Sequence, residues 1–331
     1  MDLSRAILVT GGCGFIGSAF VRRYLEQRPA WPLINLDALT YAGNPENLKN
    51  LPADAKYTFV EGSIDDAELV DRLARQSWAI VNFAAESHVD RSLYGPREFV
   101  STNIQGTVTL LEAAKRHKLR FLQVSTDEVY GSLGPEGRFS EASPITPNNP
   151  YAATKAAADH MALSYARSFG MDVRVTRSSN NYGPRQYPEK FIPLLITNAL
   201  EGKDLPVYGD GAQIRDWLFV EDNCDGILAV LERGRDGEVY NLGGDSERTN
   251  IDVASEIIRM VGDTPSKIEF VKDRPGHDRR YAIDCKKAWH ELGWEPKMKF
   301  HDGLMLTVMW YRSNPDWVSR VKSGAFRVIK H

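Results

Sequence analysis

The sequence has few of the residues that build disulfides and metal sites. Of its 331 residues, 3 are cysteine and 7 are histidine. Cys13, Cys224 and Cys285 are scattered and form no Cys-x-x-Cys pair, and the histidines show no spacing typical of metal ligands. We therefore expect no bound metal, and the cysteine usage favours a reducing, cytoplasmic location.

The sequence also lacks an excess of one charge and any long apolar run. Its formal net charge is -3 and its lysines and arginines form no basic stripe, which argues against a nucleic-acid partner. It has no run of about 18 apolar residues, and the run at Ala6–Val9 is too short for a signal peptide. These absences predict a soluble protein with no targeting segment and no membrane partner.

What is present is an alternation of short β-branched runs with helical patterns. This alternation predicts strands joined by crossover helices, and hence an α/β fold with a Rossmann-type, doubly wound parallel sheet. Six strands are expected, at residues 6–10, 33–36, 57–60, 79–84, 120–125 and 173–176.

The rhythm loosens after Arg177, where short strands such as 216–220 mix with helices such as 251–262 and 302–312. This change predicts a Rossmann domain over residues 1–177 and a smaller C-terminal α/β domain over residues 178–331. The boundary is approximate, because some C-terminal segments are expected to return to the first domain.

A glycine-rich stretch, "TGGCGFIG", directly follows the first strand and opens the first helix. Gly11, Gly14 and Gly17 leave room for a tight turn and for a pyrophosphate close to the amides at the helix start. Asp37 lies 20 residues after Gly17, at the end of the second strand, where a carboxylate binds the adenosine ribose. Because a carboxylate there repels a 2′-phosphate, the pattern predicts NAD rather than NADP.

A tyrosine and a lysine share one face of a predicted helix. Asn149 is a good N-cap and Pro150 suits the first helical position, so Tyr151 falls in the first turn and Lys155 four residues later. We expect the Lys155 ammonium, helped by a nicotinamide cation, to lower the pKa of Tyr151 from about 10 toward neutrality. Beside a dinucleotide site, this pair indicates hydride-transfer chemistry.

The same helix is rich in alanine over residues 152–166 and is apolar on more than one face. Such a helix is usually buried on both sides. We therefore expect a homodimer in which this helix, together with the helix near 105–118, meets a second subunit.

Two adjacent carboxylates, Asp127 and Glu128, end the strand in "VSTDEVYG". Like charges this close raise each other's pKa, so the pair suits acid–base catalysis in which one member stays protonated. A solvated turn would also place two acids here, and the pair alone leaves both interpretations open.

Nearly the whole chain resembles the extended short-chain dehydrogenases/reductases and, among them, the dTDP-glucose 4,6-dehydratase family. The resemblance rests on the stretches "TGGCGFIG", "LDALTYAGN", "FAAESHVDRS", "STDEVYG", "YAATK", "NNYGP", "PEKFIP", "PVYGDG", "RDWLFVEDN" and "DRPGHDRRYAID". It implies oxidation at C4 of dTDP-glucose with Tyr151 as base, elimination of water across C5 and C6, and return of the hydride to C6. Glu128 is then the base at C5 and Asp127 the acid at C6.

The resemblance also implies the site residues. The catalytic set is Thr126, Asp127, Glu128, Tyr151 and Lys155. The NAD-binding set is Gly11, Gly14, Phe15, Ile16, Gly17, Asp37, Leu39, Thr40, Ser63, Ile64, Ala84, Ala85, Thr102, Tyr151, Lys155 and Asn181. The nucleotide-sugar set, expected in the C-terminal domain and at its border, is Ser87, Thr126, Asn180, Lys190, Phe191, Pro206, Val207, Tyr208, Arg215, Asn250, Arg274 and His277.

Some positions depart from the family pattern, among them Ser63, which stands where an aspartate beside the adenine is usual. Two alternative functions remain open from the sequence. The first is a 4,6-dehydratase, epimerase or decarboxylase that acts on a UDP-sugar, since a hydrophobic pocket separates thymine from uracil by only about 1–3 kcal/mol. The second is a dinucleotide-sensing protein without turnover.

Overall fold

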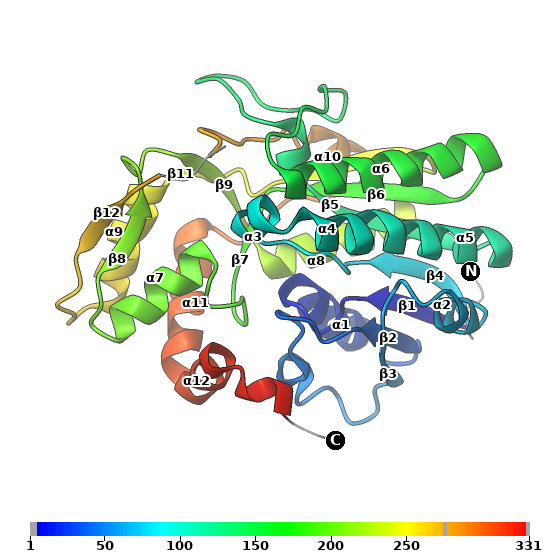
Figure 1. Ribbon diagram of the computed structural model, residues 1–331, viewed down its shortest axis with the longest axis horizontal. Helices are drawn as coiled ribbons and strands as arrows, with labels where there is room; N and C mark the ends of the chain where they lie inside the picture. Colours follow the sequence, from blue (N-terminus) through cyan, green and yellow to red (C-terminus); the bar gives the residue numbers. More distant parts are fainter. Residues whose placement is uncertain (1–4, 274–276, 329–331) are drawn as a thin grey trace.

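The computed structural model describes residues 5–273 and 277–328. A twisted sheet with helices on both faces forms the larger part, and a second group of short strands and helices lies beside it (Figure 1). Within the described residues, no helix is long and apolar enough to cross a membrane.

The main sheet has seven parallel strands in the order β10-β6-β5-β4-β1-β2-β3. Their bounds are β1 Ala6–Thr10, β2 Leu33–Asp37, β3 Tyr57–Glu61, β4 Ser77–Asn82, β5 Arg120–Thr126, β6 Val173–Ser178 and β10 Glu238–Leu242. The sequence predicts the first six, and the expectation of six strands is wrong by one. The seventh strand, β10, comes from the second half of the chain and pairs with β6, a long-range contact that no local pattern indicates.

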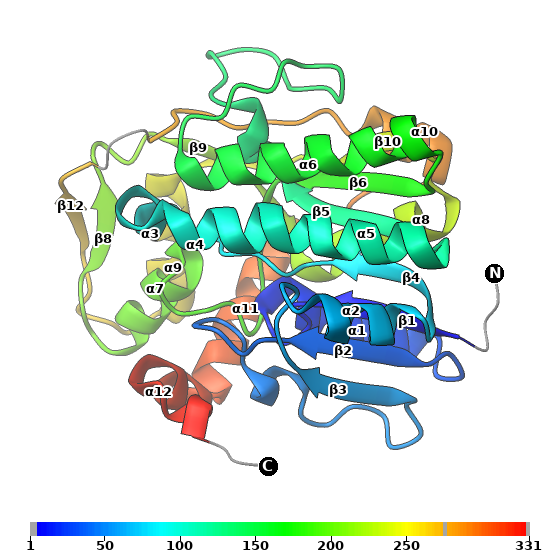
Figure 2. The ribbon, with the colours of Figure 1, turned by 45° about the vertical axis from the view of Figure 1, so that its right-hand side comes forward.

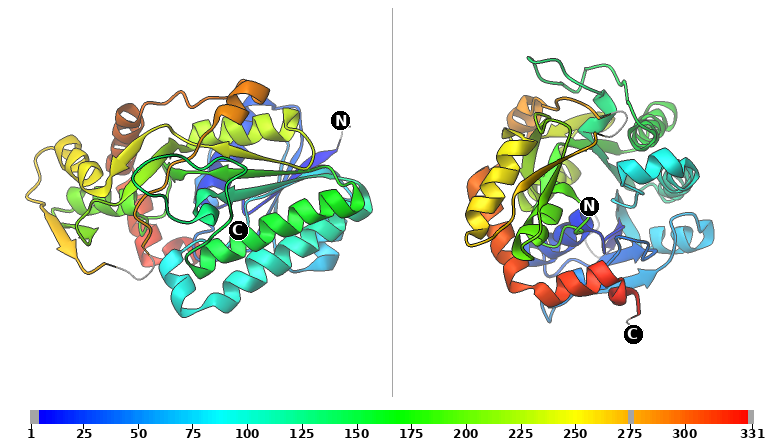
Figure 3. Two further views of the ribbon diagram at one scale, coloured as in Figure 1. Left: turned by 90° about the horizontal axis from the view of Figure 1, so that it is seen from above. Right: turned by 60° about the vertical axis from the view of Figure 1, so that its left-hand side comes forward.

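Helices cover both faces of this sheet because its central strands are apolar on both sides. Ile7 and Val9 of β1 face α1 (Phe15–Gln27), α8 (Val220–Arg233) and α10 (Lys286–Leu292). Ala6 and Leu8 face α2 (Ala67–Ala74), α5 (Thr107–His117) and α6 (Pro150–Phe169). The long helices α5 and α6 run side by side on this second face (Figures 2 and 3).

The start of α6 confirms the helix boundary expected from the sequence. The Asn149 side chain accepts a hydrogen bond from the amide of Ala152 at 2.8 Å, and Pro150 occupies the first helical position. Gly170 ends the helix with φ of 62°. The cap therefore fixes the start of the helix and puts Tyr151 in its first turn.

The second part of the molecule has its own core. Strands β7 (Asn180–Tyr182), β9 (Ile214–Phe219) and β11 (Glu247–Thr249) form one small sheet, and β8 (Leu205–Tyr208) pairs with β12 (Ile268–Val271). The helices packed against them are α7 (Phe191–Leu200), α9 (Asn250–Val261), α11 (Phe300–Ser313) and α12 (Pro315–Ser323). The remaining elements are η1 (Pro45–Leu48), α3 (Val89–Tyr94), α4 (Pro96–Phe99), the π-helical η2 (Val100–Gly106), η3 (Asp127–Tyr130) and η4 (Ala325–Val328).

Candidate active site

A cavity of about 350 Å³ lies at the carboxyl ends of β1 and β4, where the strand order reverses. This position is where parallel α/β sheets bind ligands. Most of the residues expected from the sequence line it: Gly11, Gly14, Phe15, Ile16, Gly17, Asp37, Thr40, Ser63, Ile64, Ala84, Ala85, Ser87, Thr102, Thr126, Asp127, Tyr151, Lys155, Asn180, Asn181 and Lys190.

The glycine-rich turn leaves no room for a side chain at Gly11 or Gly17. Gly11 has φ of +70°, and a Cβ there would lie 2.7 Å from the amide nitrogen of Ala84. A Cβ on Gly17 would lie 2.2 Å from the carbonyl oxygen of Gly11. No side chain caps α1, whose N-cap is Gly14, so its first amides remain available to an anion.

Asp37 closes the same turn from the end of β2. Its carboxylate accepts hydrogen bonds from the amides of Cys13 and Leu39, both at 2.8 Å, and burial raises its pKa. The two bonds leave further lone pairs of the carboxylate for a ribose hydroxyl. Leu39 supplies a backbone contact here but does not line the cavity.

The cavity wall carries several buried polar atoms that find no hydrogen-bond partner within the described residues. They include Asn44 Nδ2, Ser125 Oγ, Asp127 Oδ2, Asn180 Oδ1 and Gln186 Oε1. Buried polar groups are rarely left unpaired, so these atoms indicate a polar ligand. Together with the glycine cradle and Asp37, they fit a dinucleotide such as NAD.

Tyr151 and Lys155 lie in the cavity and are 9% and 4% exposed. The chain's own groups do not lower the pKa of Tyr151 as expected. Burial raises that pKa, and the carboxylate of Glu128 raises it further, while a hydrogen bond from Thr126 lowers it. The Lys155 ammonium donates to the carbonyl oxygen of Val124 at 2.7 Å, and burial lowers the pKa of Lys155 to about 8.

Asp127 and Glu128 stand in different environments. Asp127 is 1% exposed, and burial raises its pKa well above the usual range, with further contributions from Glu128 and Asp216. Glu128 is only partly buried, and Asn149 donates to its carboxylate at 3.5 Å. The Thr126 hydroxyl caps the turn by accepting from the Glu128 amide at 3.2 Å. This burial of Asp127 excludes the solvated turn.

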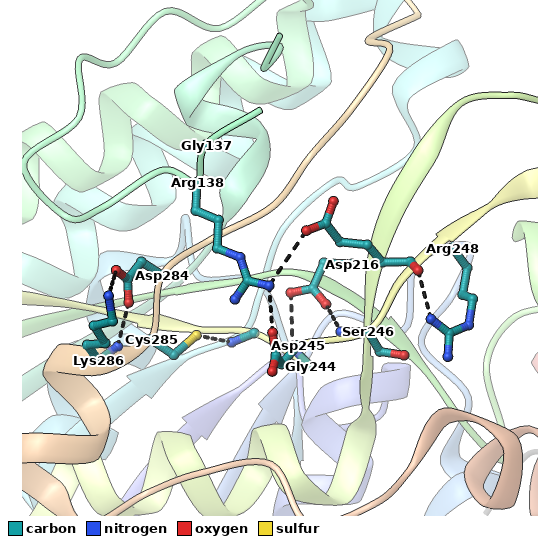
Figure 4. A network of polar contacts seen from close by, with 12 residues as sticks. Gly137, Arg138, Asp216, Gly244, Asp245, Ser246, Arg248, Asp284, Cys285 and Lys286 are labelled. Carbon is teal, nitrogen blue, oxygen red and sulfur yellow. Dashed lines mark hydrogen bonds and ion pairs between the residues drawn. The ribbon is translucent and has the colours of Figure 1, made fainter. Parts of the chain in front are cut away.

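A second buried carboxylate, Asp216 on β9, lies near Asp127 and was missed from the sequence. It accepts hydrogen bonds from the amides of Gly244 and Ser246 at 3.1 and 2.7 Å (Figure 4). These bonds hold the strand that carries Arg215, whose guanidinium lies 4.5 Å from the Tyr281 ring and lowers the pKa of Asp127. Only the fold brings this strand to the acid pair, because Asp216 lies far along the chain.

The expected nucleotide-sugar residues divide into two groups. Those in the cavity include Lys190, whose ammonium donates to the carbonyl oxygen of Ser87 at 2.9 Å. The others lie outside it: Phe191, Pro206, Val207, Tyr208, Arg215, Asn250 and His277.

The side chain of Val207 is fully buried in the core, so only its backbone can reach a ligand. The imidazole of His277 contacts Asp273 at 2.6 Å and packs 6.0 Å from the Tyr208 ring. Arg274 lies outside the described residues.

The cavity also includes residues that the sequence did not indicate, among them Tyr41, Arg185, Tyr187 and Trp317. The Tyr41 and Tyr187 rings pack edge to face at 5.8 Å. Arg185 has φ of 70°, and burial lowers its pKa to about 10. Trp317 belongs to α12, far from every motif in the chain, so no spacing signal could have found it.

The fold and the site place the chain among the extended short-chain dehydrogenases/reductases. Residues 8–307 match the family model described as GDP-mannose 4,6 dehydratase. The chain is 51% identical to a dTDP-glucose 4,6-dehydratase of Xanthomonas campestris pv. campestris, over 97% of each chain. The chain belongs to the dTDP-glucose 4,6-dehydratase family.

Solved structures agree with this assignment. DesIV, a dTDP-glucose 4,6-dehydratase from Streptomyces venezuelae solved with NAD bound, superposes with a TM-score of 0.93 at 50% identity and covers 96% of this chain and 99% of its own. A UDP-glucose 4-epimerase from Thermotoga maritima has a TM-score of 0.87 at 31% identity, over 94% of this chain and 99% of its own.

Proposed function

We propose that this protein is an NAD-dependent dTDP-glucose 4,6-dehydratase, which forms dTDP-4-keto-6-deoxyglucose and water. The observation that carries the proposal is the buried acid Asp127, whose pKa is raised and which lines one cavity with Tyr151. The half-buried Glu128 does not line this cavity, but its carboxylate is close enough to raise the pKa of both residues. An elimination needs a proton donor and a proton acceptor at the same time, and these two environments supply one of each.

The residues of the chain divide the proton transfers among themselves. When bound at the glycine cradle, NAD supplies reversible hydride transfer. Tyr151 takes the proton of the C4 hydroxyl, with Thr126 as its hydrogen-bond partner. The resulting 4-ketone acidifies the hydrogen at C5. Glu128 removes that proton, and Asp127 protonates the departing C6 hydroxyl, which leaves as water. After the hydride returns to C6, Glu128 gives its proton back to C5, which completes the 4-keto-6-deoxy sugar.

The two ends of the substrate are held by different surfaces. Ser87, Asn180 and Lys190 line the cavity, and we assign them to the sugar end of the substrate. Arg215, Asn250 and His277 lie outside the cavity. Together with Arg274, which is outside the described residues, we assign them to the nucleotide diphosphate, whose phosphate oxygens match the guanidinium groups of the two arginines. We propose a domain boundary near residue 177. The later elements α8 and β10 belong to the first domain, because they pack on or pair within its sheet.

The protein is proposed to act as a homodimer in the cytoplasm. On the outer surface of the α5–α6 layer, Val100 and Phe169 are 42% and 56% exposed, and Ala153 and Ala157 are also accessible. A second copy would bury this apolar surface. The three free cysteines are compatible with a reducing compartment.

The test is to incubate the protein with NAD and, separately, dTDP-glucose, UDP-glucose or GDP-mannose, and to determine the mass of each product. We expect loss of one water, with the highest rate for dTDP-glucose. A sugar epimerised without change of mass would contradict the proposal and favour the UDP-sugar epimerase. NAD binding without conversion of any of the three sugars would favour a sensing protein.

A further inference from the structure

A buried ion pair lies between the helix that carries Tyr151 and the sheet. Asp159 on α6 and Arg177 on β6 are 0% and 3% exposed. The Arg177 Nε donates to Asp159 Oδ2 at 2.9 Å. Neither residue lines the cavity, and both are buried between α6 and the sheet.

Arg177 also reaches the turn that carries the two catalytic carboxyl groups. Its Nη1 donates to the hydroxyl of Tyr130 at 3.0 Å, and its guanidinium carbon lies 4.9 Å from the centre of that ring. The Tyr130 hydroxyl donates in turn to Asn241 Oδ1 of β10 at 2.8 Å. Tyr130 is the last residue of η3, which begins at Asp127. The ion pair therefore connects α6 to the acid turn.

Asp159 is also four residues after Lys155 on α6, so the two buried side chains leave the helix on the same side. Burial lowers the pKa of Lys155, and Asp159 raises it. Other titratable groups on the elements packed around Lys155, and near it in the chain or the sheet, are Tyr151 on α6, Asp127, Glu128 and Tyr130 on η3 and Arg177 on β6. The same elements also carry His160, Tyr165 and Arg167 on α6, Arg120 on β5 and Arg174 on β6. The charged side chains of α3, α4 and α5 are exposed or half-exposed.

Folding stability alone does not explain the ion pair of Asp159 and Arg177. Replacing both partners of a buried ion pair by uncharged groups is often neutral for folding. In addition, Asp159 Oδ1 has no hydrogen-bond partner within the described residues, although a buried carboxylate is most stable when both oxygens are paired. Besides pairing with Arg177, Asp159 lies one helical turn from the buried Lys155, whose pKa it raises.

We propose that Asp159, with Arg177, is a positioning residue for the reaction: the pair joins α6 to the Asp127–Glu128 turn, holds that turn in register with Tyr151, and places a carboxylate one helical turn from the Lys155 ammonium. The proposal rests on the proposed function. Because Asp159 acts through Lys155, its loss should change the pH dependence of turnover as well as its size.

The test uses the double variant Asp159→Asn with Arg177→Gln, which removes both charges. The single Asp159→Asn variant leaves a buried guanidinium unpaired, so its folding is expected to suffer. Asp172→Asn is the matched control, because Asp172 pairs with Arg174 at the opposite end of β6.

For the double variant we expect a folded protein that binds NAD as the wild type does in calorimetry. The alkaline limb of its kcat profile should move to lower pH by about 1 unit, the lower end of the effect of a nearby opposite charge. The single variant Asp159→Glu keeps the negative charge, so the alkaline limb of its kcat profile should stay at the wild-type pH. The control Asp172→Asn should also leave the limb at the wild-type pH. A folded double variant with the wild-type limb would overturn the proposal.

A second readout does not depend on turnover. The Lys155 ammonium can be titrated by heteronuclear NMR in the wild type and in the double variant. A lower midpoint in the variant supports the inference, and equal midpoints contradict it. If the wild type failed to dehydrate dTDP-glucose, the proposed function would fall, while this titration would still decide the role of Asp159.

Discussion

The Asp127→Asn variant tests whether Asp127 is the proton donor at C6 while Glu128 is the proton acceptor at C5. Asparagine keeps the shape of the side chain but cannot give a proton to the C6 hydroxyl. Tyr151, Lys155 and the glycine cradle are untouched, so oxidation at C4 should survive. Elimination should become the slow step, and reduced cofactor and the 4-keto sugar should accumulate on the enzyme.

The size of the effect follows from the environment of Asp127. Its Oδ2 has no hydrogen-bond partner within the part of the chain that the structure describes, and its burial leaves little room for water to replace it as a donor. General acid catalysis is typically worth about 10²–10⁴-fold, which corresponds to about 2.7–5.4 kcal/mol of barrier. We expect kcat to fall by that factor.

The stability of the same variant should change in the opposite direction. Asp127 has a folded-state pKa above its unfolded value of about 3.9, so the unfolded state releases its proton first as the pH rises. This difference destabilises the native protein above about pH 4, and asparagine removes it. The Tm of Asp127→Asn at pH 7 should therefore exceed that of the wild type, and the gain should vanish below about pH 4.

The assay is rapid quench with mass analysis, combined with absorbance of the reduced cofactor and thermal melts. Asp54→Asn serves as the control, since this exposed carboxylate does not line the cavity. A dehydration rate of Asp127→Asn within a few-fold of the wild type would refute the acid role. A large loss of activity together with a lower Tm at pH 7 would show that the change acted through folding.

Three further predictions concern other parts of the site. Asp37→Ala should weaken NAD binding and improve relative binding of NADP, measured by calorimetry; an unchanged ratio would show that the ribose is recognised elsewhere. Glu128→Gln should abolish exchange of the C5 hydrogen with deuterated water while C4 oxidation continues, and wild-type exchange would remove Glu128 as the base. Ala157→Glu should convert the dimer into a monomer in light scattering, and a monomeric wild type at micromolar concentration would contradict the proposed interface.

The parts of the site that the sequence predicted well are set by neighbours in the chain. The glycine turn and Asp37 belong to one strand–helix–strand unit, so their geometry is decided within some thirty residues. The Asn149 cap likewise fixes the start of α6 through a contact three residues long. In such units the local backbone geometry sets the positions of the side chains, independently of contacts with distant segments.

The features that the sequence missed depend on contacts between distant segments. β10 joins the sheet beside β6, and Asp216 reaches the acid turn on a strand from the second half. The chain's own groups raise the pKa of Tyr151, contrary to the effect expected of Lys155, for a related reason. Helical spacing placed the two residues on one face, but burial and the carbonyl oxygen of Val124, which lies on β5, determine the state and contacts of the lysine.

The central claim is that one cavity oxidises, dehydrates and reduces the same sugar. The most direct measurement is the overall reaction of dTDP-glucose in deuterated water, followed by product mass and by the absorbance of reduced cofactor. We predict a product that has lost one water and gained one deuterium at C5, with no net formation of NADH. Stoichiometric NADH, or a product of unchanged mass, would contradict the account.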